Sequence, residues 1–224
     1  LTSGEIGDSA NPLPKKGTLY NQVSKVVAPD GYQLRRVKVF SSMDKSVDIN
    51  VFSFEHPTTI QAPPTADDTA KIRAYIDAEL RGSSEFDEAL YGEAAMQDYF
   101  DKCTKHYCSN SSPRRFLVQR KLYEDVKGTD RTVVDIEKRE STGDTWISIV
   151  SGNILPRQLL EVTAKLLTDN GLSIGRSHLD TVKDDMLHPD DSYGCVSMLR
   201  LNIDEHPSLH DKEAMAQLAY SLQR

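Results

Sequence analysis

The stretch TWISIVSGNILPRQLLEVTAKLLTDNGLSIG, residues 145–175, contains the signals that decide the fold of this chain. Residues 145–150 predict a strand, and a loop at 151–156 leads out of it. A helix is expected at about 157–168, because apolar side chains recur there at helical spacing. The triplet that ends in Gly171 stops this helix in the manner of a left-handed C-cap. The stretch therefore predicts a strand, a helix and the start of a second strand.

The residues after Gly171 predict two strands and a last helix. Strands are expected at 172–182 and 193–203, with a polar excursion at 183–191 between them. The last helix carries apolar side chains at Met215, Leu218, Ala219 and Leu222. The order strand, helix, strand, strand, helix is that of a ferredoxin-like unit without its last strand. Such a sheet buries one face under two helices, and its other face needs a partner.

The first third of the chain repeats this order of elements. A helix is expected around residues 19–27, and the breaker Pro29-Asp30-Gly31 ends it. Two alternating strands at 32–42 and 47–55 predict an antiparallel hairpin, and a helix is expected at 69–80. The first third thus has the same order as the last third.

The two copies also align residue by residue. Three pairs share an offset of 140 residues (159 − 19), namely Leu19 and Leu159, Gly31 and Gly171, and Arg36 and Arg176. His56-Pro57 matches His206-Pro207 at an offset of 150 (206 − 56), because the link between the strands is longer in the second copy. The alignment predicts an internal duplication. The alternative is that two segments rich in strands and helices fall into partial register by chance.

The middle of the chain predicts short helices at 83–110 and strands at 116–123 and 131–138. The basic pairs Arg114-Arg115 and Arg120-Lys121 are interpreted as a solvated strand edge that guards against aggregation. The predicted organisation is a flexible lead-in at 1–16, a first module at 17–82, a mostly helical linker at 83–114, and a second module with its preceding strands at 115–224.

The composition indicates a soluble globular chain, with 38% hydrophobic and 27% charged residues. A formal net charge of −7 disfavours a nucleic-acid partner, since an acidic chain repels phosphate backbones. No apolar run approaches the roughly 20 residues that a membrane span needs, and residues 1–5 do not resemble a signal peptide. Three cysteines are a sparse, odd set that fits a reducing compartment, so an intracellular protein, cytoplasmic or mitochondrial, is expected.

No catalytic or metal site is expected from the motifs. Cys103, His106 and Cys108 lie close together, but zinc needs four ligands and no second cluster is evident, so a helical segment is preferred. No glycine-rich motif for dinucleotides or phosphates occurs. No serine or cysteine has a convincing base partner in the sequence. We therefore expect no catalytic residue, no metal and no cofactor in this stretch.

Two stretches carry a family resemblance. Residues 156–162, PRQLLEV, followed by Leu172-Ser173-Ile174, resemble the ACT-domain pattern Pro-Gly-x-Leu-x-x-Val with its later Ile-Asn-Ile. A wider stretch, from Tyr99-Phe100 through 145–153 to the strand ending near Asp204, is similar to the N-terminal regulatory region of the large NAD-dependent glutamate dehydrogenases. The resemblance covers most of residues 17–224.

The resemblance implies an α+β fold of two ferredoxin-like ACT-type modules with antiparallel sheets, joined by a helical and strand linker. It implies a regulatory or oligomerisation fragment of an oxidoreductase that converts glutamate to 2-oxoglutarate and ammonia. The expected partners are a downstream catalytic domain that would hold the NAD, further copies of the chain in a homo-oligomer, and an amino-acid effector. A stand-alone amino-acid sensor and a purely structural oligomerisation module are the alternatives.

The candidate effector site is the turn before the helix at 157–168, and it comprises Gly152, Asn153, Ile154, Leu155, Pro156 and Arg157. Backbone N–H groups at a helix N-terminus attract carboxylates, and an arginine there is able to pair with one. The chain departs from the ACT pattern in two places, with Arg157 where the glycine stands and, in the first copy, Lys16 where the proline stands before Gly17. An ordinary strand–helix turn with a solvated arginine is the alternative.

Overall fold

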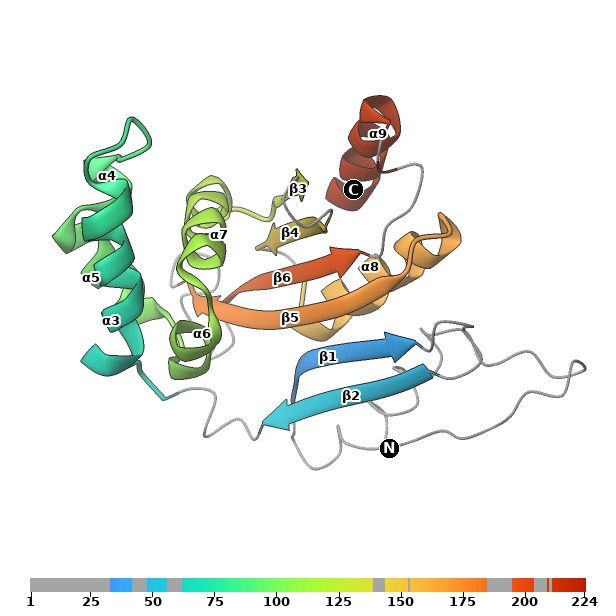
Figure 1. Cartoon of the computed structure of the whole chain (residues 1–224), viewed down its shortest axis with the longest axis horizontal. Coiled ribbons are helices and arrows are strands. Elements are labelled where there is room, and N and C mark those ends of the chain that lie inside the picture. Colours follow the sequence, from blue (N-terminus) through green and yellow to red (C-terminus); the bar gives the residue numbers. More distant parts are fainter. Residues whose placement is uncertain are drawn as a thin grey trace, which may run out of the picture.

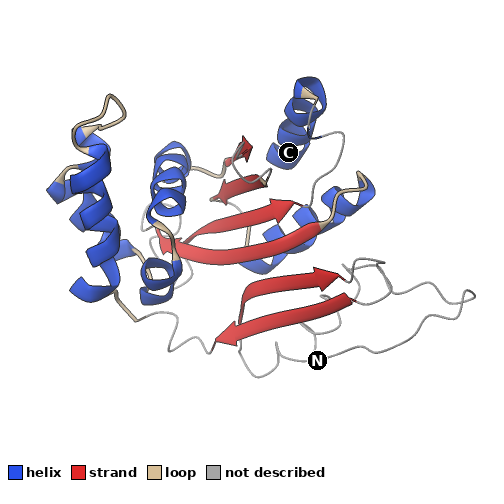
Figure 2. Ribbon diagram, viewed as in Figure 1, coloured by secondary structure: helices blue, strands red, loops and turns tan. Residues whose placement is uncertain are grey.

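The computed structural model describes residues 33–41, 48–55, 62–138, 144–152, 154–184, 195–203, 209 and 211–224. Over these residues the protein is α+β, and helices pack against both faces of one antiparallel sheet (Figure 1). Figure 2 shows the helices and strands by type. The lead-in at 1–16 and the helix expected around 19–27 lie outside the described residues.

Six strands form the sheet in the order β2-β1-β5-β6-β4-β3, and every neighbouring pair is antiparallel. The bounds are β1 Gln33–Ser41, β2 Asp48–Glu55, β3 Thr132–Lys138, β4 Thr145–Ser151, β5 Ile174–Lys183 and β6 Cys195–Ile203. The strands of the predicted ferredoxin-like unit are β4, β5 and β6 in chain order. In the sheet β6 lies between β4 and β5, as in that fold. β3, which precedes the unit in the chain, lies at the edge of the sheet beside β4. β3, β4, β6 and β5 thus form a four-stranded part of the six-stranded sheet.

The prediction of two modules with separate sheets is not confirmed. The hairpin β1–β2 is present as predicted, but it continues the sheet of β5 and β6 (Figure 1). β1 pairs with β5 through three residue pairs, Arg36 with His178, Val37 with Ser177, and Lys38 with Arg176. Strands from the first and last thirds of the chain therefore share one hydrogen-bonded sheet.

The helices of the described residues are α3 Ala66–Tyr75, α4 Glu88–Tyr91, α5 Glu93–Lys102, α6 Lys105–Asn110, α7 Pro113–Val126, α8 Pro156–Asp169 and α9 Lys212–Gln223, with the π-helical turn η2 Ile76–Leu80 continuing α3. The short helices expected at 83–110 and the helix expected at 69–80 are thus confirmed. Helices α3 to α7 form one layer, which we call the N-terminal layer. We call the sheet face under this layer the N-terminal face, and the face under α8 and α9 the C-terminal face.

Successive side chains of the central strands β4, β5 and β6 point to opposite faces of the sheet and contribute to two different hydrophobic cores. Val150, Val182, Val196 and Met198 lie on the N-terminal face and pack with the buried side chains of the N-terminal layer. Ile147, Ile149, Leu179, Leu199, Leu201 and Ile203 lie on the C-terminal face and pack under α8 and α9. The centre of the sheet is therefore buried on both faces, which explains the nearly continuous apolar runs of β4 and β6.

The helix predicted at 157–168 is confirmed as α8, and its ends follow from local chemistry. Pro156 takes the first helical position, where its missing N–H removes no helical hydrogen bond. Gly171 adopts φ 75°, the left-handed conformation that ends many helices, and Leu172 donates its N–H to the Leu167 carbonyl at 2.9 Å. Leu159, Leu160 and Leu167 are buried against the sheet.

The strand predicted at 116–123 is wrong, because these residues belong to α7. Ser112 caps this helix by accepting a hydrogen bond from the Arg115 N–H at 3.3 Å, and Pro113 begins it. Phe116, Tyr123 and Val126 are buried at helical spacing. The helical period of buried residues along 113–126 therefore outweighs the short apolar run at 116–118.

The strand edge predicted at Arg114-Arg115 and Arg120-Lys121 is also wrong, because all four residues lie on α7, and of the four only Arg114 and Lys121 are largely solvated. Arg115 and Arg120 are each only 4% exposed, and both lie on α7 rather than on a strand. The Arg120 guanidinium carbon lies 4.5 Å from the ring centre of Tyr99. Guanidinium groups are weakly hydrated and stack on aromatic faces, so these arginines are packed into the N-terminal layer.

The pairing of β1 with β5 follows the offset of the sequence repeat. Val37 pairs with Ser177, and the difference between their numbers is 140 (177 − 37). The pairing within each hairpin shifts at the same place, between Leu34 and Arg36 in β1 and between Ile174 and Arg176 in β5. These positions again differ by 140 (174 − 34). The strands β1 and β5 are therefore related by a local two-fold arrangement centred on Val37 and Ser177.

The first turn of α3 gives a pH-dependent prediction. Hydrogen bonds from Ser109 and from the Thr65 backbone and hydroxyl lower the pKa of Asp68 from 3.8 to about 2. A lowered folded-state pKa stabilises the protein above the unfolded value, and this contribution is lost as pH falls through the folded value. We expect Asp68→Asn to be less stable than wild type in urea at pH 6 and the difference to shrink at pH 3. An unchanged difference at pH 3 would contradict this assignment.

Candidate functional site

The turn between β4 and α8 places most of the predicted effector residues together. Gly152 is buried, and its N–H donates to the Arg131 carbonyl at 3.0 Å. The Ser197 hydroxyl donates to the Ile154 carbonyl at 2.7 Å, which ties the turn to β6. Asn153 and the side chain of Arg157 lie outside the described residues. The turn is thus anchored by two hydrogen bonds to neighbouring strands.

The N-cap residue of α8 makes no side-chain cap. Leu155 holds the N-cap position, is 56% exposed, and offers no side-chain acceptor to the first turn of the helix. Among the described side chains, Leu155 therefore gives no cap to the amides that follow Pro156. An uncapped first turn is able to accept a carboxylate. The Gly152 amide, by contrast, is already used within the sheet and does not contribute a donor.

A second polar region lies on the N-terminal face of the sheet and was not expected from the sequence. Arg200 on β6 is 2% exposed, and its guanidinium donates to the Ser148 hydroxyl and the Glu137 carboxylate, each at 3.3 Å. Its guanidinium carbon also lies 5.0 Å from the ring centre of Trp146. Arg114 of α7 reaches the same Glu137 carboxylate at 2.7 Å. One acid on β3 thus joins β6 to α7.

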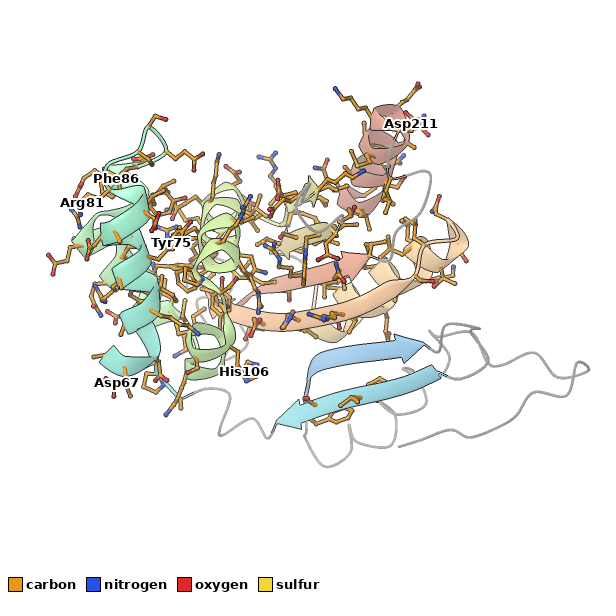
Figure 3. All side chains as sticks on the ribbon, viewed as in Figure 1. Asp67, Tyr75, Arg81, Phe86, His106 and Asp211 are labelled. Atoms are coloured by element: carbon orange, nitrogen blue, oxygen red, sulfur yellow. The ribbon has the colours of Figure 1, made fainter. Side chains whose placement is uncertain are left out.

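Asp180 on β5 is the centre of a second buried polar cluster. It is 2% exposed and forms an ion pair with Arg115 of α7, whose Nε also donates to the Gln119 side-chain carbonyl at 3.0 Å. His106 of α6 places its Nε2 3.9 Å from the other Asp180 oxygen. Figure 3 shows His106 on α6, near the end of β5. This cluster ties α6 and α7 to the sheet.

Two atoms of the Asp180 cluster lack a hydrogen-bond partner in the described part of the chain. They are one carboxylate oxygen of Asp180 and the side-chain nitrogen of Gln119. Buried polar atoms are usually satisfied, so these two atoms mark the part of the cluster that the described side chains leave without a hydrogen bond.

The acids of β3 differ in their surroundings. Burial raises the pKa of Asp135, and the negative charge of nearby Glu137 adds to the increase. Asp135 pairs with Ser148 in the strand register, and Ser148 pairs with Arg200, so these three residues form one row on the N-terminal face. The row combines an acid, a hydroxyl and a guanidinium, and it is able to hold a polar ligand or to fix the sheet against α7.

Two of the three cysteines, Cys103 and Cys108, are buried, and Cys195 is half-buried. Cys103 ends α5, Cys108 lies in α6, and both are buried. Burial raises the pKa of the Cys103 thiol, which disfavours the reactive thiolate. In the described residues no group of three or more histidine, cysteine or acidic side chains is placed to hold a metal ion. His106 and Cys108 lie in α6, whereas Cys103 lies between α5 and α6 and forms an isolated bridge with Val182 of β5.

Comparison with known proteins gives no assignment. No family model matches the chain, and no curated protein matches it. In the part of the chain that the structure describes, none of the helices has both the length and the apolar content needed to cross a membrane.

Proposed function

We propose that this chain is a regulatory and assembly module of a larger NAD-dependent glutamate dehydrogenase. In this proposal two ACT-like units, one in each copy of the sequence repeat, bind an amino-acid effector and hold copies of the enzyme together. The catalytic domain and its NAD belong to another part of the enzyme. The units act on it by favouring one arrangement of the assembly, with a coupling free energy of about 1–3 kcal/mol, as in other allosteric proteins.

The observation that carries the proposal is the pairing of β1 with β5. Val37 pairs with the residue that is its own counterpart in the repeat, Ser177, and both strands have a register shift at counterpart positions. Two copies of one unit joined edge to edge by a two-fold axis would produce this pattern. If the two segments were unrelated and aligned only by chance, register shifts at counterpart positions of β1 and β5 would not be expected.

The effector part of the proposal rests on the α8 N-terminus. The uncapped first turn after Pro156 is suited to a carboxylate, and Arg157 adds a positive charge to this turn. The engaged Gly152 amide favours a second candidate function, a unit that only assembles the enzyme and binds no effector. Effector binding therefore needs a direct test.

The test is calorimetry of the 224-residue chain with each of the common amino acids, including glutamate and aspartate. We expect at least one to bind, and Arg157→Ala to weaken its affinity about tenfold, since a hydrogen bond to a charged group contributes about 1.5–3 kcal/mol. The matched control is Lys165→Ala, which removes one positive charge from an exposed position of the same helix, about 12 Å further along its axis.

Three outcomes separate the candidates. Binding that Arg157→Ala weakens and Lys165→Ala preserves supports the effector site. Binding that both variants preserve places the effector elsewhere. No heat with any amino acid, together with a stable oligomer in light scattering, supports the assembly function alone and overturns the sensing part of the proposal.

A further inference from the structure

We propose that Cys103 and Cys108 are a site of reversible disulfide formation, at the place where α5 and α6 meet the end of β5. The oxidant is a small-molecule disulfide of the glutathione type. The bond joins the residue before the cap of α6 to the fourth residue of that helix. This site is separate from the turn at 152–157 and does not rest on the proposed effector function.

The capping of α6 brings the two cysteines to one side of its first turn. Thr104 is the N-cap residue, and its hydroxyl accepts a hydrogen bond from the Tyr107 N–H at 3.1 Å. Cys103 therefore stands directly before the cap, and Cys108 is the fourth residue of the helix. Apolar side chains at these two positions often pack against each other and fix the entry of the chain into a helix. In α6 both of these positions hold a thiol.

The surrounding structure holds both cysteines in place. Cys103 is 5% exposed and Cys108 is fully buried, and both belong to the core of the N-terminal layer. The Cys103 N–H donates to the Phe100 carbonyl at 3.0 Å, and the residue bridges to Val182 of β5 (Figure 1). The Cys108 N–H donates to the Thr104 carbonyl at 3.1 Å within the first turn of α6. The two thiols therefore approach each other from backbone segments that are already fixed.

The environment of the pair sets how fast it reacts. Burial raises the pKa of the Cys103 thiol, a hydrogen bond with the Cys108 side chain adds to the increase, and the positive charge of Arg120 opposes it. The thiolate is the form that attacks a disulfide, so oxidation of the closed structure is slow. Local opening of the six-residue helix α6 is the step that exposes the thiols to the oxidant.

The reaction consists of two thiol–disulfide exchanges. One cysteine loses its proton, and its sulfur attacks a sulfur of oxidised glutathione, which forms a mixed disulfide and releases one glutathione thiolate. The other cysteine loses its proton and attacks the protein sulfur of the mixed disulfide. The bond between Cys103 and Cys108 forms, and the second glutathione thiolate leaves. Two protein thiols are oxidised, one oxidised glutathione is reduced to two glutathione molecules, and these take up the two protons.

The bond changes how α6 is attached to the sheet. Cys103 is bridged to β5, whereas Cys108 lies in α6, whose His106 Nε2 is 3.9 Å from a carboxylate oxygen of Asp180. A covalent link between the two cysteines therefore holds α6 against the end of β5, beside the Asp180 cluster. We expect the backbone amides of α6 to exchange with solvent more slowly in the oxidised chain than in the reduced chain, because local opening is restricted.

The experiment incubates the folded 224-residue chain with oxidised glutathione, and a parallel sample with reduced glutathione. Remaining thiols are then alkylated in denaturant, and tryptic peptides are identified by mass spectrometry. Trypsin cuts after Lys105, between the two cysteines, so a bond joins the peptides 103–105 and 106–114. We expect this linked pair in the oxidised sample, its loss on addition of dithiothreitol, and Cys195 as the cysteine that is still alkylated.

Three variants make the result specific. Cys195→Ala is the matched control, since it removes the third cysteine, at the start of β6, and should keep the linked pair. Cys103→Ala and Cys108→Ala should each abolish it. The proposal is overturned if Cys103 and Cys108 both remain alkylatable in oxidised wild type. It is also overturned if oxidation joins either of them only to Cys195 or to another copy of the chain, or if α6 amides exchange equally fast in the oxidised and reduced chains.

Discussion

Replacing Asp180 with alanine is expected to lower the free energy of unfolding by about 3–5 kcal/mol, because removal of one partner leaves a buried charge uncompensated. Asp180 and Arg115 are 2% and 4% exposed, so bulk solvent does not screen the charge that remains on the guanidinium. Arg115 also holds the Gln119 side chain, so the whole contact between α7 and β5 loses its anchor. Urea unfolding followed by circular dichroism measures the loss.

A double variant distinguishes the charge effect from simple loss of packing. Arg115→Met combined with Asp180→Leu removes both charges and keeps apolar volume, and such replacements of buried ion pairs are often neutral or stabilising. We therefore expect the double variant to recover most of the stability that Asp180→Ala loses. If the double variant were as unstable as the single one, the ion pair would not be the cause.

Replacing Phe116 with alanine is expected to lower the free energy of unfolding by about 3–5 kcal/mol, as is usual when a buried aromatic ring is removed. The Phe116 ring is fully buried at the centre of an aromatic cluster. Its ring centre lies 5.4 Å from those of Tyr99 and Phe100 and 5.1 Å from that of Tyr107. These three rings come from α5 and α6, so the cavity would lie where three helices of the N-terminal layer meet.

The control for this substitution lies on the same helix. Leu122→Ala removes a partly buried side chain at the margin of the same core, and we expect a distinctly smaller loss. Calorimetric unfolding of both variants gives the comparison. Equal losses would mean that the core of the N-terminal layer does not depend on the aromatic cluster.

The strands and the last two helices were predictable from the sequence because their signals are local. Alternation identifies β1 and β2, and a leucine-rich helical face closed by Gly171 identifies α8. The residues of α7 were misassigned because the short apolar run Phe116-Leu117-Val118 does not by itself distinguish a strand from a helix. The helix start at Ser112-Pro113 was the local signal that would have corrected the assignment.

The polar clusters were less accessible to sequence reasoning. The turn at 152–157 follows from a motif, but Arg200 and Asp180 acquire their surroundings only from the register between strands. Arg200 stands within the apolar run of β6, and Asp180 within β5. A charged residue within a strand buried on both faces is the available signal, since such a residue requires a partner. Which partner it meets depends on packing between segments far apart in the sequence.

The junction of β1 and β5 has a consequence for how the chain is made. The hairpin β1–β2 is synthesised before β5. Val37 pairs with Ser177, which follows it by 140 residues (177 − 37), so this pairing forms only after those residues have been made. At the usual rates of synthesis, about 5–20 residues per second, the edge of β1 stays unpaired for roughly 7–28 seconds. Exposed strand edges aggregate, and charged residues on an edge oppose this. We therefore expect Arg36 and Lys38, as charged residues of β1, to oppose aggregation of the nascent hairpin during this interval.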